Sequence, residues 1–180
     1  MTLLQFVSIA ISAILYFAFF WLNDWLFAMT ALHDGANWIF LPAGLRLLCT
    51  LIFAGEGAVG LLLASLLIGF MRTHSMDLIT QFGAALISAG APYIAYRGAL
   101  KIGMPASLEK LSAGGLGVLA LAYALTSSFL HSFWFMVRGF FTGFLQGWSV
   151  MFIGDLIGTL IMVYLLKTIL AVARRTRPAA

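Results

Sequence analysis

Two oppositely charged residues, Arg46 and Asp155, lie near the middle of long apolar segments of the sequence. Arg46 lies in WIFLPAGLRLLCTLIFAG, and Asp155 lies in GWSVMFIGDLIGTLIMVYLLK. In a membrane-spanning helix each charge costs about 2.5 to 3.5 kcal/mol to insert, so both side chains are expected to face the bundle interior. We predict that they form a buried ion pair. Such a pair either fixes helix packing or belongs to a polar pocket that binds a ligand, ion or proton.

A proline and a glycine lie close to Arg46. Pro42 precedes it by four residues, and a proline inside a helix removes one backbone hydrogen bond and clashes with the preceding turn. We therefore expect a kink or break at Pro42, Ala43 and Gly44. Irregular backbone at membrane depth is tolerated where protein or a water-filled cavity supports it, so this stretch is either an ordinary proline kink or part of a site.

Small residues recur at helical spacing in the later segments. Gly143 with Gly147, and Gly154 with Gly158, repeat the pattern that lets membrane helices approach closely. Pro92 should kink its own helix as Pro42 does. Close packing within the chain is the expected use of these glycines, and oligomerisation is the alternative.

Ser127, Ser128 and His131 share one face of a predicted helix through their i, i+3 and i+4 spacing. They either line a polar pocket near the outer side, or they are serines bonded to their own helix and an interfacial histidine. No glycine-rich nucleophile turn accompanies them, which argues against a hydrolase. The spacing of His33, His74 and His131 matches no metal motif, so we predict no metal and no cofactor.

The overall composition indicates a protein whose solvent is lipid. Hydrophobic residues make up 63% of the 180 residues, charged residues only 9%, and the mean hydropathy is +1.05. A soluble domain is about a quarter charged, and at this length it buries only roughly 70% of its unfolded surface. The net charge of +4 comes from Lys and Arg near helix ends, as is typical of membrane proteins, so a nucleic-acid partner is not expected.

The sequence predicts an all-α, polytopic transmembrane bundle of about six helices, with no soluble domain. A spanning helix needs roughly 20 mostly apolar residues. The six apolar runs are 3–22, 38–54, 58–71, 78–96, 116–136 and 140–166. Runs two and three are short and are joined only by Gly55, Glu56 and Gly57, so they should form a tight hairpin or a partly re-entrant pair, and five true spans are possible. Residues 1–172 form one domain, followed by a basic tail, 173–180.

The distribution of charge predicts the orientation, because Lys and Arg gather in cytoplasmic connections. With six spans one side receives most of the cations: Arg97, Lys101, Lys110, Lys167, Arg174, Arg175 and Arg177. The other side receives only Arg72 and Arg138, together with three aspartates. Both termini should then be cytoplasmic, in the inner membrane of a bacterium. The tryptophans flanking the first outer connection agree with this orientation.

Two stretches resemble a known family. FLPAGLRLLCTLIFAGEGAVGLLLASLLIGF is similar to the proline-alanine-glycine helix and hairpin of bacterial membrane-associated sensor (MASE-type) domains, and GWSVMFIGDLIGTLIMVYLL resembles their Gly-Asp helix. The resemblance implies a sensory core formed by Pro42, Ala43, Gly44, Arg46, Gly154, Asp155 and Gly158. The same hairpin, with the chain's size, also resembles the substrate-binding S components of energy-coupling vitamin transporters.

These observations favour a sensory or small-molecule-binding module that acts through a partner protein. Arg46 would anchor an anionic group, Asp155 would be its counter-ion or a ligand contact, and Ser127, Ser128 and His131 would lie near the mouth of the pocket. The alternatives are an accessory subunit of a larger membrane complex and the substrate-binding component of a transporter. An enzyme is not expected, because acid and base catalysis needs titratable groups within mutual reach and only one acid is deeply buried.

Overall fold

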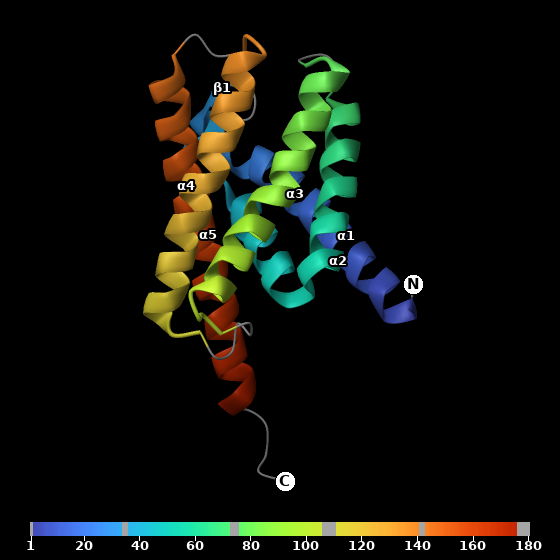
Figure 1. Ribbon diagram of the computed structural model, residues 1–180, viewed down its shortest axis with the longest axis vertical. Helices are drawn as coiled ribbons and strands as arrows, with labels where there is room; N and C mark the ends of the chain where they lie inside the picture. The colour runs from blue at the N-terminus through green and yellow to red at the C-terminus, as the bar shows by residue number, and fades with distance from the viewer. Residues whose placement is uncertain (1, 34–35, 73–75, 106–110, 141–142, 176–180) are drawn as a thin grey trace.

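The structure, a computed structural model, describes residues 2–33, 36–72, 76–105, 111–140 and 143–175, and Figure 1 shows their arrangement. Five helices make up the bundle, and each is long and apolar enough to cross a membrane. They are α1 (Leu3–Phe27), α2 (Leu41–Met71), α3 (Leu78–Lys101), α4 (Ala113–Val137) and α5 (Phe144–Arg175). A 3-10 turn (Ala28–Thr30) and a two-stranded antiparallel ribbon, β1 (Ala31–His33) with β2 (Ala36–Asn37), connect α1 to α2. The predicted helical membrane bundle is confirmed.

Helix α2 is folded back on itself at Ala54. That residue has φ 48° and ψ −118°, a conformation that side-chain-bearing residues rarely adopt. The two halves, 41–53 and 55–71, then pack together: a Cβ at Gly57 would overlap the carbonyl of Cys49, and Cys49 joins Leu61 in one apolar cluster. Figure 1 shows α2 descending, turning and rising again. The predicted hairpin is therefore present, and the five helices contain six helical segments.

The first half of α2 is short for a membrane span. Its residues, 41–53, extend about 20 Å at 1.5 Å per residue, whereas the hydrocarbon core is about 30 Å thick. The second half, 55–71, extends about 25 Å by the same rise. Both halves are shorter than that thickness, which favours the partly re-entrant form, one of the two forms that the short runs predicted.

The predicted kink at Pro42 is wrong. Helix α2 begins at Leu41, so Pro42 lies in its first turn, where the missing N–H has no helical partner to lose. The backbone N–H of Leu41, the first residue of α2, donates to the side-chain oxygen of Asn23 in α1 at 2.9 Å, so another helix caps the start of α2. Pro42 thus starts the helix that carries Arg46. Pro92 lies within α3, which continues past it to Lys101.

Glycines of α5 bring its backbone against the start of α2. A Cβ at Gly154 would overlap the Asn37 carbonyl oxygen, and a Cβ at Gly158 would overlap that of Phe40. The backbone N–H of Phe40 donates to the carbonyl of Gly154 at 3.2 Å. Gly44 also packs closely on α5, against Met162 and Gly158, so these glycines serve packing within the chain.

The ends of the bundle separate its connections into two groups. One end, here called the strand end, carries the β1–β2 ribbon, the ends of α2 and α4 and the starts of α3 and α5 (Figure 1). The start of α1, the end of α3, the start of α4 and the end of α5 lie toward the other end. The central helix is α2, which packs against α1, α3 and α5, while α4 packs between α3 and α5. This up-and-down order is the one that six segments predict.

Candidate functional site

A cavity of about 130 Å³ lies inside the bundle. All five helices contribute to its wall, and its polar lining includes Tyr16, Arg46, Ser88, His131 and Asp155. One water molecule needs roughly 10 to 15 Å³ of such a cavity, so the cavity has room for several waters or a small solute. Arg46 and Asp155, the two charges that the sequence analysis singled out, therefore line the same cavity.

Arg46 is held on one side of this cavity by aromatic residues. Its side chain is buried, and Nε and Nη2 both donate to the hydroxyl of Tyr16, at 2.9 and 2.5 Å. The guanidinium carbon also lies 5.1 Å from the ring centroids of Tyr16 and of Phe40, within cation–π range. No described hydrogen bond uses Nη1, so both N–H donors of that nitrogen are left for a bound group.

Asp155 lines the same cavity from α5 and is equally buried, and it interacts electrostatically with Arg46 without forming an ion pair or a hydrogen bond with it. The ion pairs among the described residues are Arg72 with Asp24 and Arg138 with Asp77. The predicted buried ion pair is therefore wrong, because Tyr16 and Phe40 hold the guanidinium toward α1 and the start of α2. The two charges share the cavity without neutralising each other through a direct contact.

His131 of α4 also lines the cavity, which for this residue is the first of the two alternatives that the sequence left open. Its Nδ1 lies 3.0 Å from the carbonyl oxygen of Ser127, and its Nε2 lies 3.3 Å from the hydroxyl of Ser88 on α3. Since a carbonyl can only accept, Nδ1 carries the proton of this contact, and in the neutral ring Nε2 accepts from Ser88. His131 thus has a fixed orientation and links α4 to α3 at the cavity wall.

Ser127 and Ser128 are buried beside the cavity without lining it. The Ser128 hydroxyl donates to the carbonyl of Leu125 in its own helix at 3.3 Å, which is the alternative that the sequence left open. The Ser127 hydroxyl lies near Asp155 but has no partner in hydrogen-bond geometry, and the same holds for the buried Tyr123 hydroxyl. Tyr123 lies close enough to Arg46 and Asp155 to interact with both electrostatically.

The cavity extends toward the strand end, where Arg72, Met76 and Gln81 contribute to its lining. The guanidinium of Arg72 forms an ion pair with Asp24 and lies 4.9 Å from the ring centroid of Phe20. The side chain of Arg72 is 31% exposed, whereas Arg46 and Asp155 are each 6% exposed. Exposure is therefore greater at the strand end than at Arg46 and Asp155, and this part of the lining, Arg72, Met76 and Gln81, is here called the entrance.

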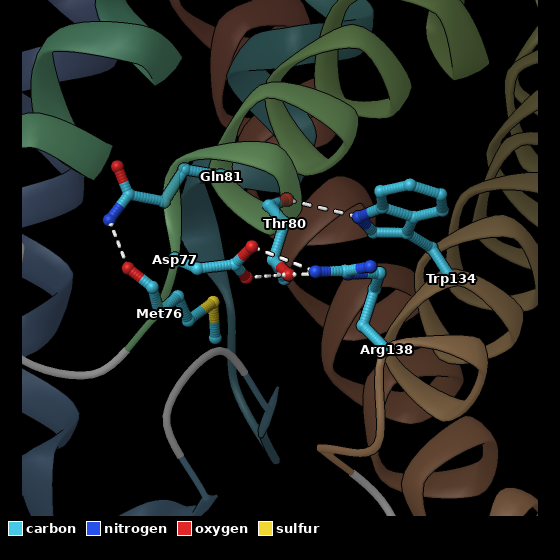
Figure 2. Close-up of polar contacts among 6 residues, drawn as sticks. All are labelled: Met76, Asp77, Thr80, Gln81, Trp134 and Arg138. Atoms are coloured by element: carbon cyan, nitrogen blue, oxygen red, sulfur yellow. Dashed lines mark hydrogen bonds and ion pairs between the residues drawn. The ribbon is translucent and has the colours of Figure 1, made fainter.

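A polar clasp beside this entrance joins α3 to α4 (Figure 2). Arg138 donates to Asp77 at 2.7 Å and to the Thr80 hydroxyl at 2.9 Å, and the Trp134 indole donates to the Thr80 carbonyl at 3.0 Å. The Thr80 hydroxyl in turn donates to Asp77. That hydrogen bond, together with the positive charge of Arg138, lowers the pKa of the Asp77 carboxyl.

Gln81 directly follows Thr80 in α3, and its side chain points back toward the residues that precede the helix. Its amide nitrogen donates to the backbone oxygen of Met76 at 2.7 Å (Figure 2). Its side chain also packs against Gly69 of α2, where a Cβ would approach it to 3.3 Å. Gln81 thus fixes the edge of the entrance between α2 and α3.

The predicted site residues divide into two groups. Arg46, Asp155 and His131 meet at the cavity, whereas Gly44, Gly154 and Gly158, with Pro42, set the start of α2 against α5. Neither Tyr16 nor Ser88 was singled out from the sequence, since neither carries a charge that would be conspicuous in an apolar run. His74 and Asp34 lie outside the described residues, as does the side chain of His33. Within the described residues no group of three His, Cys, Asp or Glu could hold a metal ion.

No protein-family model, curated protein or solved structure matches this chain.

Proposed function

We propose that this chain is a membrane-embedded binding module for a small polar solute, and that it senses or delivers that solute through a partner protein. The observation that supports this most is the cavity that Arg46 and Asp155 share without pairing. The two charges attract each other across the cavity, but a buried charge that is not directly paired typically costs several kcal/mol. That cost is offset when a bound solute completes the interaction.

A purely structural role for the two charges explains the arrangement less well. A structural clasp would bring the guanidinium and the carboxylate into contact, as Arg138 and Asp77 do at the entrance. Instead, Arg46 keeps free donors, and Asp155 faces the same space. Unused hydrogen-bonding capacity of opposite sign around one cavity is what a polar ligand requires.

We propose that the strand end faces the periplasm of a bacterial cell and that both termini are cytoplasmic. Most Lys and Arg of the connections then lie on the cytoplasmic side, in accordance with the positive-inside rule. The entrance beside Arg72 and Gln81 would open to the outside. A solute would reach Arg46 without crossing the membrane.

The resemblance to membrane-associated sensor domains supports signalling as the use of this binding. In the proposed mechanism, occupancy of the cavity changes how α2 packs against α5, because Arg46 and Asp155 lie on these two helices. The partner protein would respond to that change. Delivery of the solute to a transporter partner uses the same cavity and is the second form of the proposal.

Native mass spectrometry of the purified protein tests solute binding. We expect the wild-type chain to retain a small molecule that Arg46→Gln and Asp155→Asn lose. Matched controls neutralise one cation and one anion outside the cavity: Arg97→Gln on the exposed end of α3, and Glu56→Gln at the α2 turn. Both controls should retain the molecule.

A different result would favour an accessory subunit. In that case the chain would purify in a fixed stoichiometry with other membrane proteins. It would carry no small molecule, and Arg46→Gln with Asp155→Asn would assemble as the wild type does. Those results together would contradict the proposed function.

A further inference from the structure

We infer that the solute is a small zwitterion, whose anionic group binds Arg46 and whose ammonium group binds Asp155. This inference rests on the proposed function and specifies the ligand class of the same cavity. It depends on which hydrogen bonds and ion pairs the protein itself provides to Arg46 and to Asp155.

The charge of Arg46 is not neutralised by its protein contacts. The Tyr16 hydroxyl accepts from Nε and Nη2, and two aromatic rings face the guanidinium, but none of these groups carries a full negative charge. Nη1 keeps two N–H donors that no described hydrogen bond uses. An incoming carboxylate or phosphate would find both a charge and donors.

Asp155 is in the complementary situation. It is as buried as Arg46, and no described Lys or Arg forms an ion pair with it. The other cation at the cavity, Arg72, is engaged by Asp24 near the strand end. The hydroxyls of Ser127 and Tyr123 near Asp155 are neutral donors, and neither is in hydrogen-bond geometry with it. An incoming ammonium group would find a carboxylate with its acceptor capacity largely unused.

Only a ligand with both charges satisfies both residues. A simple anion would pair with Arg46 but add a second negative charge to a cavity that holds Asp155. A simple cation would repel Arg46 in the same way. Like charges brought together in a low-dielectric site are unfavourable, whereas a zwitterion has no net charge and forms a favourable pair at each end. The position of the residues on α2 and α5 means that one ligand would join these helices.

The test is equilibrium binding to the purified full-length protein in nanodiscs. The probes are ω-amino acids from glycine to 6-aminohexanoate, and each is compared with the carboxylic acid and the amine that lack one of its charges. Because the chain length sets the distance between the charges, the best probe also measures the separation of Arg46 and Asp155.

For the wild type we expect one chain length at which the zwitterion binds at least about tenfold more tightly than its acid and its amine. Arg46→Gln should reduce the affinity for the zwitterion to that for the amine, and Asp155→Asn should reduce it to that for the acid. Arg97→Gln and Glu56→Gln should leave the preference unchanged. The comparison of the three ligands on the wild type decides the question even if a cavity variant does not fold.

Two results would overturn the inference. If the acid binds as tightly as the zwitterion and Asp155→Asn has no effect, the cavity is an anion site, and the proposed solute binding stands without the zwitterion. If no zwitterion of the series binds, the bridging ligand is wrong. The native mass spectra then decide separately whether the proposed function also fails.

Discussion

The hydroxyl of Tyr16 accepts hydrogen bonds from both Nε and Nη2 of Arg46, at 2.9 and 2.5 Å. This contact joins α1 to the first half of α2 in the bundle interior. The guanidinium forms no ion pair with Asp155, although both groups line one cavity. A neutral aromatic residue, not the buried carboxylate, thus accepts the hydrogen bonds of the buried arginine.

Tyr16→Phe should destabilise the protein, because it removes the acceptor of two charge-assisted hydrogen bonds while keeping the ring. Hydrogen bonds to charged groups contribute about 1.5 to 3 kcal/mol, so we expect a loss of that order in the free energy of unfolding. Reversible unfolding in mixed micelles measures it. Tyr164→Phe is the matched control, since the Tyr164 hydroxyl makes one long, exposed bond to a backbone oxygen. Equal stability of the two variants would contradict the role of Tyr16.

Gly158→Ala should destabilise the packing of α5 against the start of α2. The added Cβ would overlap the Phe40 carbonyl oxygen, and backbone cannot move aside as a flexible side chain can. Overpacking of this kind costs about 1 to 3 kcal/mol, which unfolding in mixed micelles would detect. Gly90→Ala in α3 is the control, because nothing lies within 4 Å of its added Cβ. If both alanines are tolerated equally, the close approach is not needed.

The stability contributed by Asp77 should depend on pH. Its pKa in the folded protein is lowered, first by the Thr80 hydrogen bond and then by Arg138, so the folded state favours the charged carboxylate. This contribution is fully present above the unfolded pKa, near 4, and is lost as the pH falls through the folded pKa. The difference in melting temperature between wild type and Asp77→Asn should therefore shrink between pH 6 and pH 2. A difference that stays constant over this range would contradict the clasp.

The fold of α2 predicts that both of its ends lie on the same side of the membrane. Trp38→Cys and Met76→Cys, made in a Cys49→Ala background, should both react with an impermeant maleimide added to intact cells. Lys101→Cys at the other end of the bundle should react only after permeabilisation. Labelling of residues 38 and 76 from opposite sides would mean that α2 crosses the membrane once.

Much of the architecture could be predicted from the sequence, because apolar run length and the Gly55–Gly57 turn depend on local composition. The site could be predicted only in part. Arg46 and Asp155 are conspicuous as charges in apolar runs, but whether they touch depends on Tyr16, which looks in sequence like any aromatic residue of a membrane helix. The expected kink at Pro42 was wrong because the helix begins one residue before it, and the capping group, Asn23, belongs to α1.

The central claim is that a polar cavity, open from the strand end, reaches the buried charges. Cysteine accessibility at Ser88 tests it most directly, since Ser88 is 4% exposed and lines the cavity, whereas Ser12 is fully buried and does not. In the Cys49→Ala background, we expect a small water-soluble methanethiosulfonate added from outside to modify Ser88→Cys but not Ser12→Cys. If Ser88→Cys is as unreactive as Ser12→Cys, the interior is closed to water and the proposed site does not exist.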